Sequence, residues 1–278
     1  MPLKLGSKPL KIVGPDYNIG FLRMLIYGDS GVGKTRLMGS ALDVPELCPI
    51  LYCDSDKGTM SIAKLPLQVL PISDLADMEN AIRYVKGNPG EYKTIILDGI
   101  SSLYTTIMQE RLQSPSRGQK EDPYVPSQRD WMHATFRVRA LLQLALTAPV
   151  NFLVTALVDE RADEFTGALM IRPGLSNKLA QEIGAWFDIL GYMYVKTVKR
   201  EDVRYLQLNM GSNRKAKNRS VYDLPKIISE PTMEILYGRS VLGKTFDDSK
   251  TIEGGEDEEI TRVIKKSDTE EATEAIEE

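Results

Sequence analysis

The chain has 278 residues, of which 42% are hydrophobic and 27% are charged, with a formal net charge of −4, a balance typical of globular proteins that fold in water. No apolar run approaches the roughly 20 residues that span a membrane, and the N-terminus lacks the apolar stretch of a signal peptide, so we expect a cytoplasmic protein without membrane contact. One histidine and two cysteines argue against histidine triads and cysteine–histidine metal sites.

The first expected strand, residues 22–27, leads directly into a glycine-rich motif. Residues 28–35 fit the P-loop pattern G-x-x-x-x-G-K-[ST], in which glycines let backbone N–H groups face an anion at the start of a helix. Lys34 would reach the β- and γ-phosphates, and Thr35 would complete the shell of a Mg²⁺ ion, so the motif predicts a site for ATP and magnesium. The residues expected to bind the nucleotide are Gly28, Asp29, Ser30, Gly31, Val32, Gly33, Lys34 and Thr35.

Two further expected strands end in acidic residues. The strand at 50–53 runs into Asp54 and Asp56, and a later β-branched strand ends at Asp98. Asp98 fits the Walker B position, where a carboxylate holds the water shell of Mg²⁺ opposite the P-loop. Gly99 follows where many such ATPases carry a catalytic glutamate. We therefore expect Asp56 to orient the attacking water, unless the two earlier aspartates only cap a turn.

Strands alternate with helices along the chain, a pattern typical of an α/β fold around a mostly parallel sheet. The strand at 50–53 lies between the P-loop strand and the Asp98 strand in sequence. We expect it to lie between them in the sheet as well, which is the arrangement of additional-strand ATPases. Helices are expected at 74–85, 101–112, 128–146 and 176–186, and a late β-hairpin from 189–199 and 204–210.

Thr155 is a polar residue in the otherwise apolar strand expected at 151–157. In a parallel sheet it would lie beside Asp98, where a hydroxyl could sense the γ-phosphate and pass its state into the following loop. The alternative is a hydroxyl that only bonds the backbone.

Two loops after these strands carry basic side chains with an interleaved aromatic residue. They cover 114–127 and 159–172, the second expected as a β-hairpin. Basic and aromatic side chains together suit backbone contact and base stacking on a single nucleic-acid strand. The residues expected to contact nucleic acid are Arg117, Lys120, Arg161 and Arg172.

A basic cluster follows the last long strand and contains Arg214, Lys215, Lys217 and Arg219. Lys217 and Arg219 are two residues apart and would project together from an extended segment. The P-loop half supplies no obvious arginine finger in cis, so this pair is a candidate to reach the γ-phosphate of a neighbouring subunit. The alternative is a solvated basic loop.

The negative charge is concentrated at the C-terminal end. Residues 253–278 contain 11 acids and 3 bases, whereas residues 1–252 carry a net charge of +4. Acid-rich runs with few aromatic residues cannot bury enough apolar surface to fold. We therefore expect an arm at 1–20, a folded domain at 21–243 and an acidic, disordered tail at 244–278. The tail is a solubilising segment, a competitor for a basic groove, or a docking peptide.

Together the motifs resemble those of RecA-like ATPases, in particular the compact single-domain forms encoded by phages and implicated in single-strand annealing and recombination. The resemblance spans roughly residues 20–240. It rests on the P-loop, the acidic end of the second strand, the Asp98 strand, the Pro173-Gly174 loop and the late Lys217-Asn218-Arg219.

The resemblance implies a three-layer α/β/α fold and a homo-oligomeric ring or filament with ATP at the subunit boundaries. It implies single-stranded DNA as a partner, contacted by the two basic loops. It assigns water activation to Asp56 and action in trans to Lys217 and Arg219. RecA itself carries glutamate and glutamine where this chain has Asp56 and Thr155, and a shorter carboxylate implies slow hydrolysis.

We therefore expect a Mg²⁺-dependent ATPase of recombination, annealing or repair, with a single-strand-binding or replication protein as a further partner. If the gene is phage-encoded, the protein would work in the bacterial host cytoplasm. Two alternatives stay open. One is an ATPase motor or loader acting on a protein partner or duplex DNA in replication, and the other is a nucleotide-gated binding module with little hydrolysis.

Overall fold

The computed structural model describes residues 4–5, 8–9, 21–117, 122–162, 167–198, 200–211, 213–246 and 251–252. Most of the expected N-terminal arm and acidic tail, and Lys120, therefore lie outside the described residues. Within the arm, the short strands β1 (Lys4–Leu5) and β2 (Lys8–Pro9) pair antiparallel with each other.

A ten-stranded sheet forms the centre of the domain. Its parallel strands, in spatial order, are β10 (Ile189–Val198), β3 (Arg23–Tyr27), β7 (Asn151–Ala156), β6 (Thr94–Asp98), β4 (Ile50–Asp54) and β5 (Gln68–Pro71). The antiparallel strands continue the sheet beyond β10 as β11 (Glu201–Gln207), β13 (Ile227–Ser229) and β14 (Thr251–Ile252), while β12 (Lys217–Asn218) also pairs with β10. The late hairpin expected from the sequence is formed by β10 and β11.

The strand that separates the P-loop strand from the Asp98 strand is β7. It pairs in parallel with β3 on one side and with β6 on the other. The expectation that residues 50–53 insert there was wrong, because β4 pairs with the far side of β6. The crossover from β3 to β4 passes over two strand positions, which β6 and the fully buried β7 later fill. An additional strand is present, but a different one from that expected.

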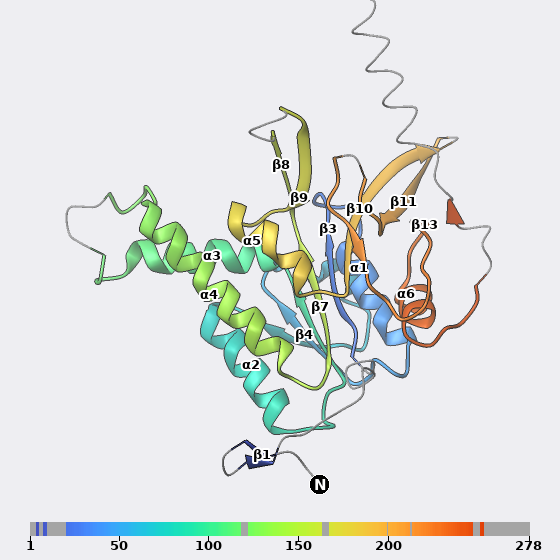
Figure 1. The fold of residues 1–278 in the computed structure, drawn as a ribbon, viewed down its shortest axis with the longest axis horizontal. Coiled ribbons are helices and arrows are strands. Elements are labelled where there is room, and N and C mark those ends of the chain that lie inside the picture. The colour runs from blue at the N-terminus through green and yellow to red at the C-terminus, as the bar shows by residue number, and fades with distance from the viewer. Residues whose placement is uncertain are drawn as a thin grey trace, which may run out of the picture.

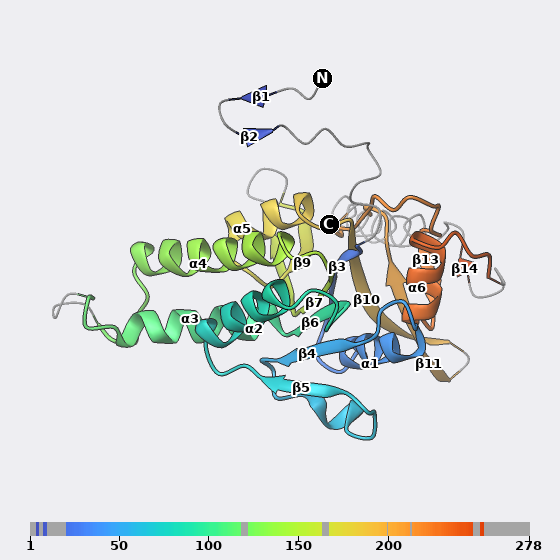
Figure 2. The ribbon, with the colours of Figure 1, turned by 90° about the horizontal axis from the view of Figure 1, so that it is seen from below.

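Helices cover both faces of the sheet and make three layers (Figures 1 and 2). One face carries α2 (Leu75–Gly87), α3 (Ile100–Gln113), α4 (Gln128–Leu146) and α5 (Asn177–Glu182), and the other carries α1 (Lys34–Gly39) and α6 (Met233–Ser240). Each interface has its own buried cluster, the first including Met78, Leu103 and Val138 and the second including Leu37, Ile96 and Leu236. The three-layer α/β/α fold predicted from the sequence is confirmed.

Two features project beyond these layers (Figure 1). One is the end of the α3–α4 pair at which the two helices are connected, and the other is the antiparallel hairpin of β8 (Val158–Ala162) and β9 (Leu169–Pro173), which follows β7 directly. Over the described residues, none of the helices has the length and apolar character needed to cross a membrane.

Candidate functional site

The P-loop connects the carboxyl end of β3 to the amino end of α1. Gly31 and Gly33 have φ angles of 82° and 104°, in the left-handed region that favours glycine. A Cβ on Gly28 would lie 2.1 Å from the carbonyl oxygen of Met193, so this position has room for glycine alone. The Lys34 ammonium donates to the carbonyl oxygens of Gly28 and Asp29 at 2.9 and 2.7 Å. The loop is thus folded as a cradle with its cation already inside.

Asp98 lies at the carboxyl end of β6, and its buried carboxylate accepts hydrogen bonds from three hydroxyl groups. The Thr35 and Tyr52 hydroxyls donate to Oδ2 at 2.8 and 2.6 Å, and the Thr155 hydroxyl donates to Oδ1. The Thr155 oxygen also accepts the Gly99 amide at 2.9 Å. Thr155 therefore lies beside Asp98, where the pairing of β6 with β7 was expected to place it. It bonds both the carboxylate and the backbone.

The contact between Tyr52 and Asp98 was not predicted from the sequence, because a tyrosine within an apolar strand is typical of a hydrophobic core. Burial raises the pKa of its hydroxyl, and the charge of Asp98 raises it further. The group therefore stays protonated and donates to Asp98, which helps to hold the carboxylate in position.

The residues at this position fit a magnesium ion. The Thr35 hydroxyl and the Asp98 carboxylate are oxygen ligands of the kind that Mg²⁺ prefers, and they lie next to each other at the mouth of the P-loop. Among the described residues there is no cluster of three or more histidine, cysteine, aspartate or glutamate side chains that could hold a metal ion. The ion would therefore need phosphate and water oxygens as well, as is usual for Mg²⁺ bound with a nucleotide.

The Asp56 carboxylate lies against Gly99. A Cβ on Gly99 would come within 2.1 Å of Asp56 Oδ1. The Asp56 carboxylate, from the turn that follows β4, thus occupies the space beside the Walker B residue that a side chain at position 99 would take. Asp54 has a different place, because its buried carboxylate accepts the amides of Asp56 and Lys57 at 3.1 and 2.9 Å and caps the turn.

The surroundings of Asp56 suit a general base. Partial burial raises the pKa of its carboxyl group, and the charge of Asp98 acts in the same direction, while a hydrogen bond from Ser102 and the charge of Lys34 oppose the shift. Burial lowers the pKa of Lys34, and the nearby carboxylates of Asp56 and Asp98 counteract that change. A carboxylate with a raised pKa is a better base for water. The catalytic role of Asp56 stays a prediction.

Replacing Gly99 by alanine should remove most of the ATPase activity. The new Cβ must displace Asp56, and the φ of 104° is strained for any residue but glycine, at a cost of about 1–3 kcal/mol. Gly90→Ala is a matched control, because Gly90 has a similar φ of 94° with nothing within 4 Å of its Cβ position. We expect both variants to melt earlier and only Gly99→Ala to lose turnover. Equal turnover in the two would show that Asp56 does not depend on the space at position 99.

The basic pair expected to act in trans lies away from the P-loop of its own chain. Lys217 donates from Nζ to the carbonyl oxygens of Gly184 and Phe187 at 2.6 and 3.1 Å. Arg219 is exposed and forms an ion pair with Asp188 at 3.0 Å, near the amino end of β3. Both side chains therefore have partners within the chain, and their action on a neighbouring subunit stays a prediction.

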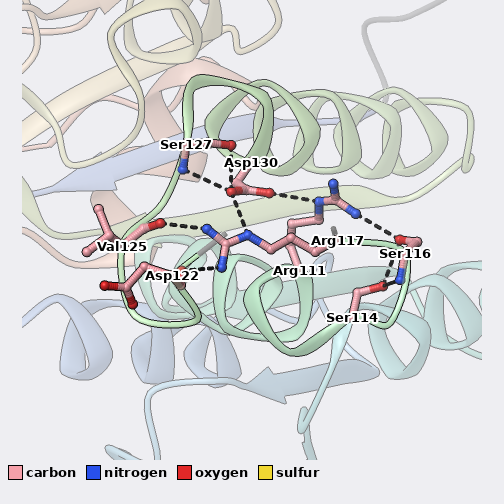
Figure 3. Close-up of polar contacts among 8 residues, drawn as sticks. All are labelled: Arg111, Ser114, Ser116, Arg117, Asp122, Val125, Ser127 and Asp130. Atoms are coloured by element: carbon pink, nitrogen blue, oxygen red, sulfur yellow. Dashed lines mark hydrogen bonds and ion pairs between the residues drawn. The ribbon is translucent and has the colours of Figure 1, made fainter. Parts of the chain in front are cut away.

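Arg117 is buried inside the α3–α4 connection. Its guanidinium forms an ion pair with Asp130 at 3.1 Å and donates to the carbonyl oxygens of Asp122 and Val125. Figure 3 shows the guanidinium groups of Arg117 and Arg111 directed at this one carboxylate. The expectation that Arg117 contacts nucleic acid is not supported, because its charge holds the connection together and only 4% of its side chain is exposed.

The two arginines of the β8–β9 hairpin share one carboxylate. Asp159 Oδ2 lies 3.0 Å from Arg161 Nε and 3.1 Å from the nearer guanidinium nitrogen of Arg172. The Arg172 side chain is largely enclosed, and it also bonds Asn177, whereas Arg161 is about half exposed. Of the two, Arg161 is the side chain available to a ligand.

A further cation beside the P-loop was missed. Arg204, on β11, lies so close to Gly33 that a Cβ there would be 2.9 Å from its Nε. This Nε is buried and has no hydrogen-bond partner among the described residues. An arginine 169 residues beyond the end of the motif gives no local signal in the sequence, since only the sheet brings β11 to the P-loop edge.

A P-loop, a Walker B aspartate two strands away and a polar residue on the strand between them define a RecA-like P-loop NTPase. The sequence matches the AAA domain family over residues 21–220, and the chain belongs to this family. No curated protein matches the sequence.

Two solved structures are similar in part. A KaiC-like protein of Pyrococcus horikoshii OT3 is 15% identical, with a TM-score of 0.42 over 76% of this chain and 90% of that one. The flagellar accessory protein FlaH of Methanocaldococcus jannaschii is 14% identical, with a TM-score of 0.42 over 78% of this chain and 92% of that one. Similarity at this level carries no argument about function.

Proposed function

We propose that this chain is a Mg²⁺-dependent ATPase that acts on single-stranded DNA in recombination, annealing or repair, and that it assembles with ATP at subunit boundaries. The observation that carries the ATPase part is the position of Asp56 against Gly99, beside the Thr35–Asp98 pair. The finer assignment to DNA draws on the resemblance to phage-encoded RecA-like ATPases and on the mildly basic domain.

Each residue of the site has a role in this proposal. Lys34 and the P-loop amides would hold the phosphates, and Thr35 and Asp98 would hold a magnesium ion, which would supply positive charge to neutralise the phosphates. Asp56 orients a water molecule and takes its proton. Thr155, bonded to Asp98 and to the Gly99 amide, is placed to respond to the γ-phosphate.

A short polar connection supports coupling of this site to DNA. Ser101, in the first turn of α3, donates to the carbonyl oxygen of Gly174 at 2.8 Å and accepts the amide of Leu157 at 3.0 Å. Those two residues flank the β8–β9 hairpin, which carries Arg161. The base of the hairpin is therefore fastened three residues beyond the Walker B aspartate.

The proposal predicts that single-stranded DNA raises the ATPase rate. We expect Lys34→Ala to lower the rate about 100-fold or more with or without DNA, because the phosphates lose their buried cation. Steady-state phosphate release, measured with single-stranded DNA, duplex DNA and no DNA, tests both points. If single-stranded DNA leaves the ATPase rate unchanged and no DNA is retained in a pull-down, the proposed action on DNA is wrong. Stimulation by duplex DNA or by a replication protein would favour a motor or loader instead.

A further inference from the structure

An apolar groove lies between α4, α5 and the β8–β9 hairpin. It has a volume of about 660 Å³. Three large side chains of α4 line it while staying half exposed, Trp131 at 46%, Met132 at 54% and Phe136 at 52%. A soluble domain rarely leaves three such side chains open on two adjacent turns without a binding role.

The lining side chains of α4 form two adjacent ridges. Met132 and Phe136 are four residues apart on one ridge, and Trp131 and Arg139 lie along the next, so all four face the groove. The Trp131 ring stacks on Tyr104 with 6.2 Å between the centroids and 23° between the planes. The Arg139 guanidinium lies 5.1 Å from the centre of the Phe136 ring. Both aromatic rings are therefore held in place by neighbours.

The two helical walls are tied to each other. The hydroxyl groups of Thr135 and Ser176 are 2.8 Å apart, and Arg139 forms an ion pair with Glu182 of α5 at 2.5 Å. A groove whose walls are already fixed loses little conformational entropy when it binds a ligand.

The charge of the groove is positive. The described residues that line it include Arg139, Arg161 and Lys178 and no acidic side chain. Beside the groove, Glu182 pairs with Arg139, and Asp159 is shared by Arg161 and Arg172, so the cations around the groove outnumber the carboxylates. Aromatic faces alone would suit an apolar peptide, and cations alone would suit any polyanion. Both together suit a chain of flat bases on a phosphate backbone.

We propose that this groove is a binding site for single-stranded DNA, in which bases stack on Trp131 and Phe136 while Arg161 and Lys178 contact phosphates. The inference rests on the proposed function and gives that function a binding surface. It places the main contact on α4, outside the two loops expected from the sequence, and Arg161 is the one residue common to both.

Binding of labelled oligothymidylate, measured by fluorescence anisotropy on the full chain, tests the site. We expect Phe136→Ala and Lys178→Ala each to weaken binding about 10-fold, and Phe136→Tyr to retain it. An abasic strand of the same length should bind the wild-type protein about 10-fold more weakly, because it offers phosphates without bases. Tyr84→Ala is the matched control, since Tyr84 is a 49% exposed aromatic residue on α2. Circular dichroism shows whether each variant is folded.

The outcomes separate this inference from the proposed function. Wild-type affinity in both groove variants would overturn the groove while leaving a DNA-stimulated ATPase intact. Failure of the wild-type chain to bind oligothymidylate would overturn both. A synthetic peptide of residues 253–278 that binds through Phe136, with oligothymidylate binding unaffected by the substitutions, would mean that an acidic segment of the chain occupies the groove.

Discussion

Asp56→Asn should lower the turnover number for ATP at least about 100-fold, because an amide oxygen cannot accept the proton of the attacking water. Nucleotide affinity should change little, since Lys34, Thr35 and Asp98 are untouched and the amide has the same shape as the carboxylate it replaces. Single-turnover hydrolysis and equilibrium binding of a fluorescent ATP analogue separate the two effects.

Asp54→Asn is the control for this experiment. Its carboxylate accepts two backbone amides through one oxygen, Oδ1, which asparagine retains. We expect turnover within about threefold of wild type, since the turn keeps its cap. If Asp56→Asn hydrolyses ATP as the wild type does, water activation must come from another group, and the position of Asp56 against Gly99 is then structural.

Asp130→Asn should lower the free energy of unfolding by about 3 kcal/mol, the usual cost of removing one partner from a buried ion pair. The carboxylate is fully buried between Arg111 and Arg117 and accepts the Ser127 amide and hydroxyl at 2.9 and 2.8 Å. The substitution removes the buried negative charge that Arg111 and Arg117 share (Figure 3). Urea denaturation followed by circular dichroism measures the loss. Asp122→Asn, at an exposed carboxylate of the same connection, should change stability by less than about 0.5 kcal/mol.

The ion pairs of Asp130 also predict that the stability of the protein depends on pH. Burial opposes ionisation of Asp130, but hydrogen bonds from Ser127, the charge of Arg117 and a hydrogen bond from Arg111 prevail and hold its pKa at about 2, below the ordinary 3.8. A depressed pKa stabilises the folded state above pH 4, and this contribution is lost as the pH falls towards 2. The difference in unfolding free energy between wild type and Asp130→Asn should therefore shrink over that interval. A constant difference would mean that the charge of Asp130 contributes nothing.

Local motifs could be predicted from the sequence because their chemistry is local. The P-loop depends on glycines within eight residues, and Asp98 on a strand that ends in a carboxylate. The order of strands could not be predicted in the same way, because a crossover can skip positions that later strands fill. The structure therefore places β7, and with it Thr155, where β4 was expected.

The surroundings of a charged side chain are the second feature that could not be predicted from the sequence. Arg117 and Arg161 look alike in a sequence, as basic residues in loops, yet one is buried against Asp130 and the other is half exposed. Partners that lie far away in sequence decide this difference. Asp54 and Asp56 follow the same strand in the sequence, and the structure gives them different places, because Asp54 caps a turn and Asp56 lies against Gly99.

The contacts of Lys217 within its own chain bear on the proposed assembly. Its ammonium group holds the carbonyl oxygens of Gly184 and Phe187, which end the helical segment that begins with α5. To neutralise a phosphate on an adjacent protomer, it must exchange these carbonyls for the nucleotide, and so loosen the C-terminal end of that segment. Oligomerisation and the α5 wall of the groove would then be linked thermodynamically. By reciprocity, the factor by which oligomerisation changes the affinity of the groove for its ligand would equal the factor by which an occupied groove changes the affinity between subunits.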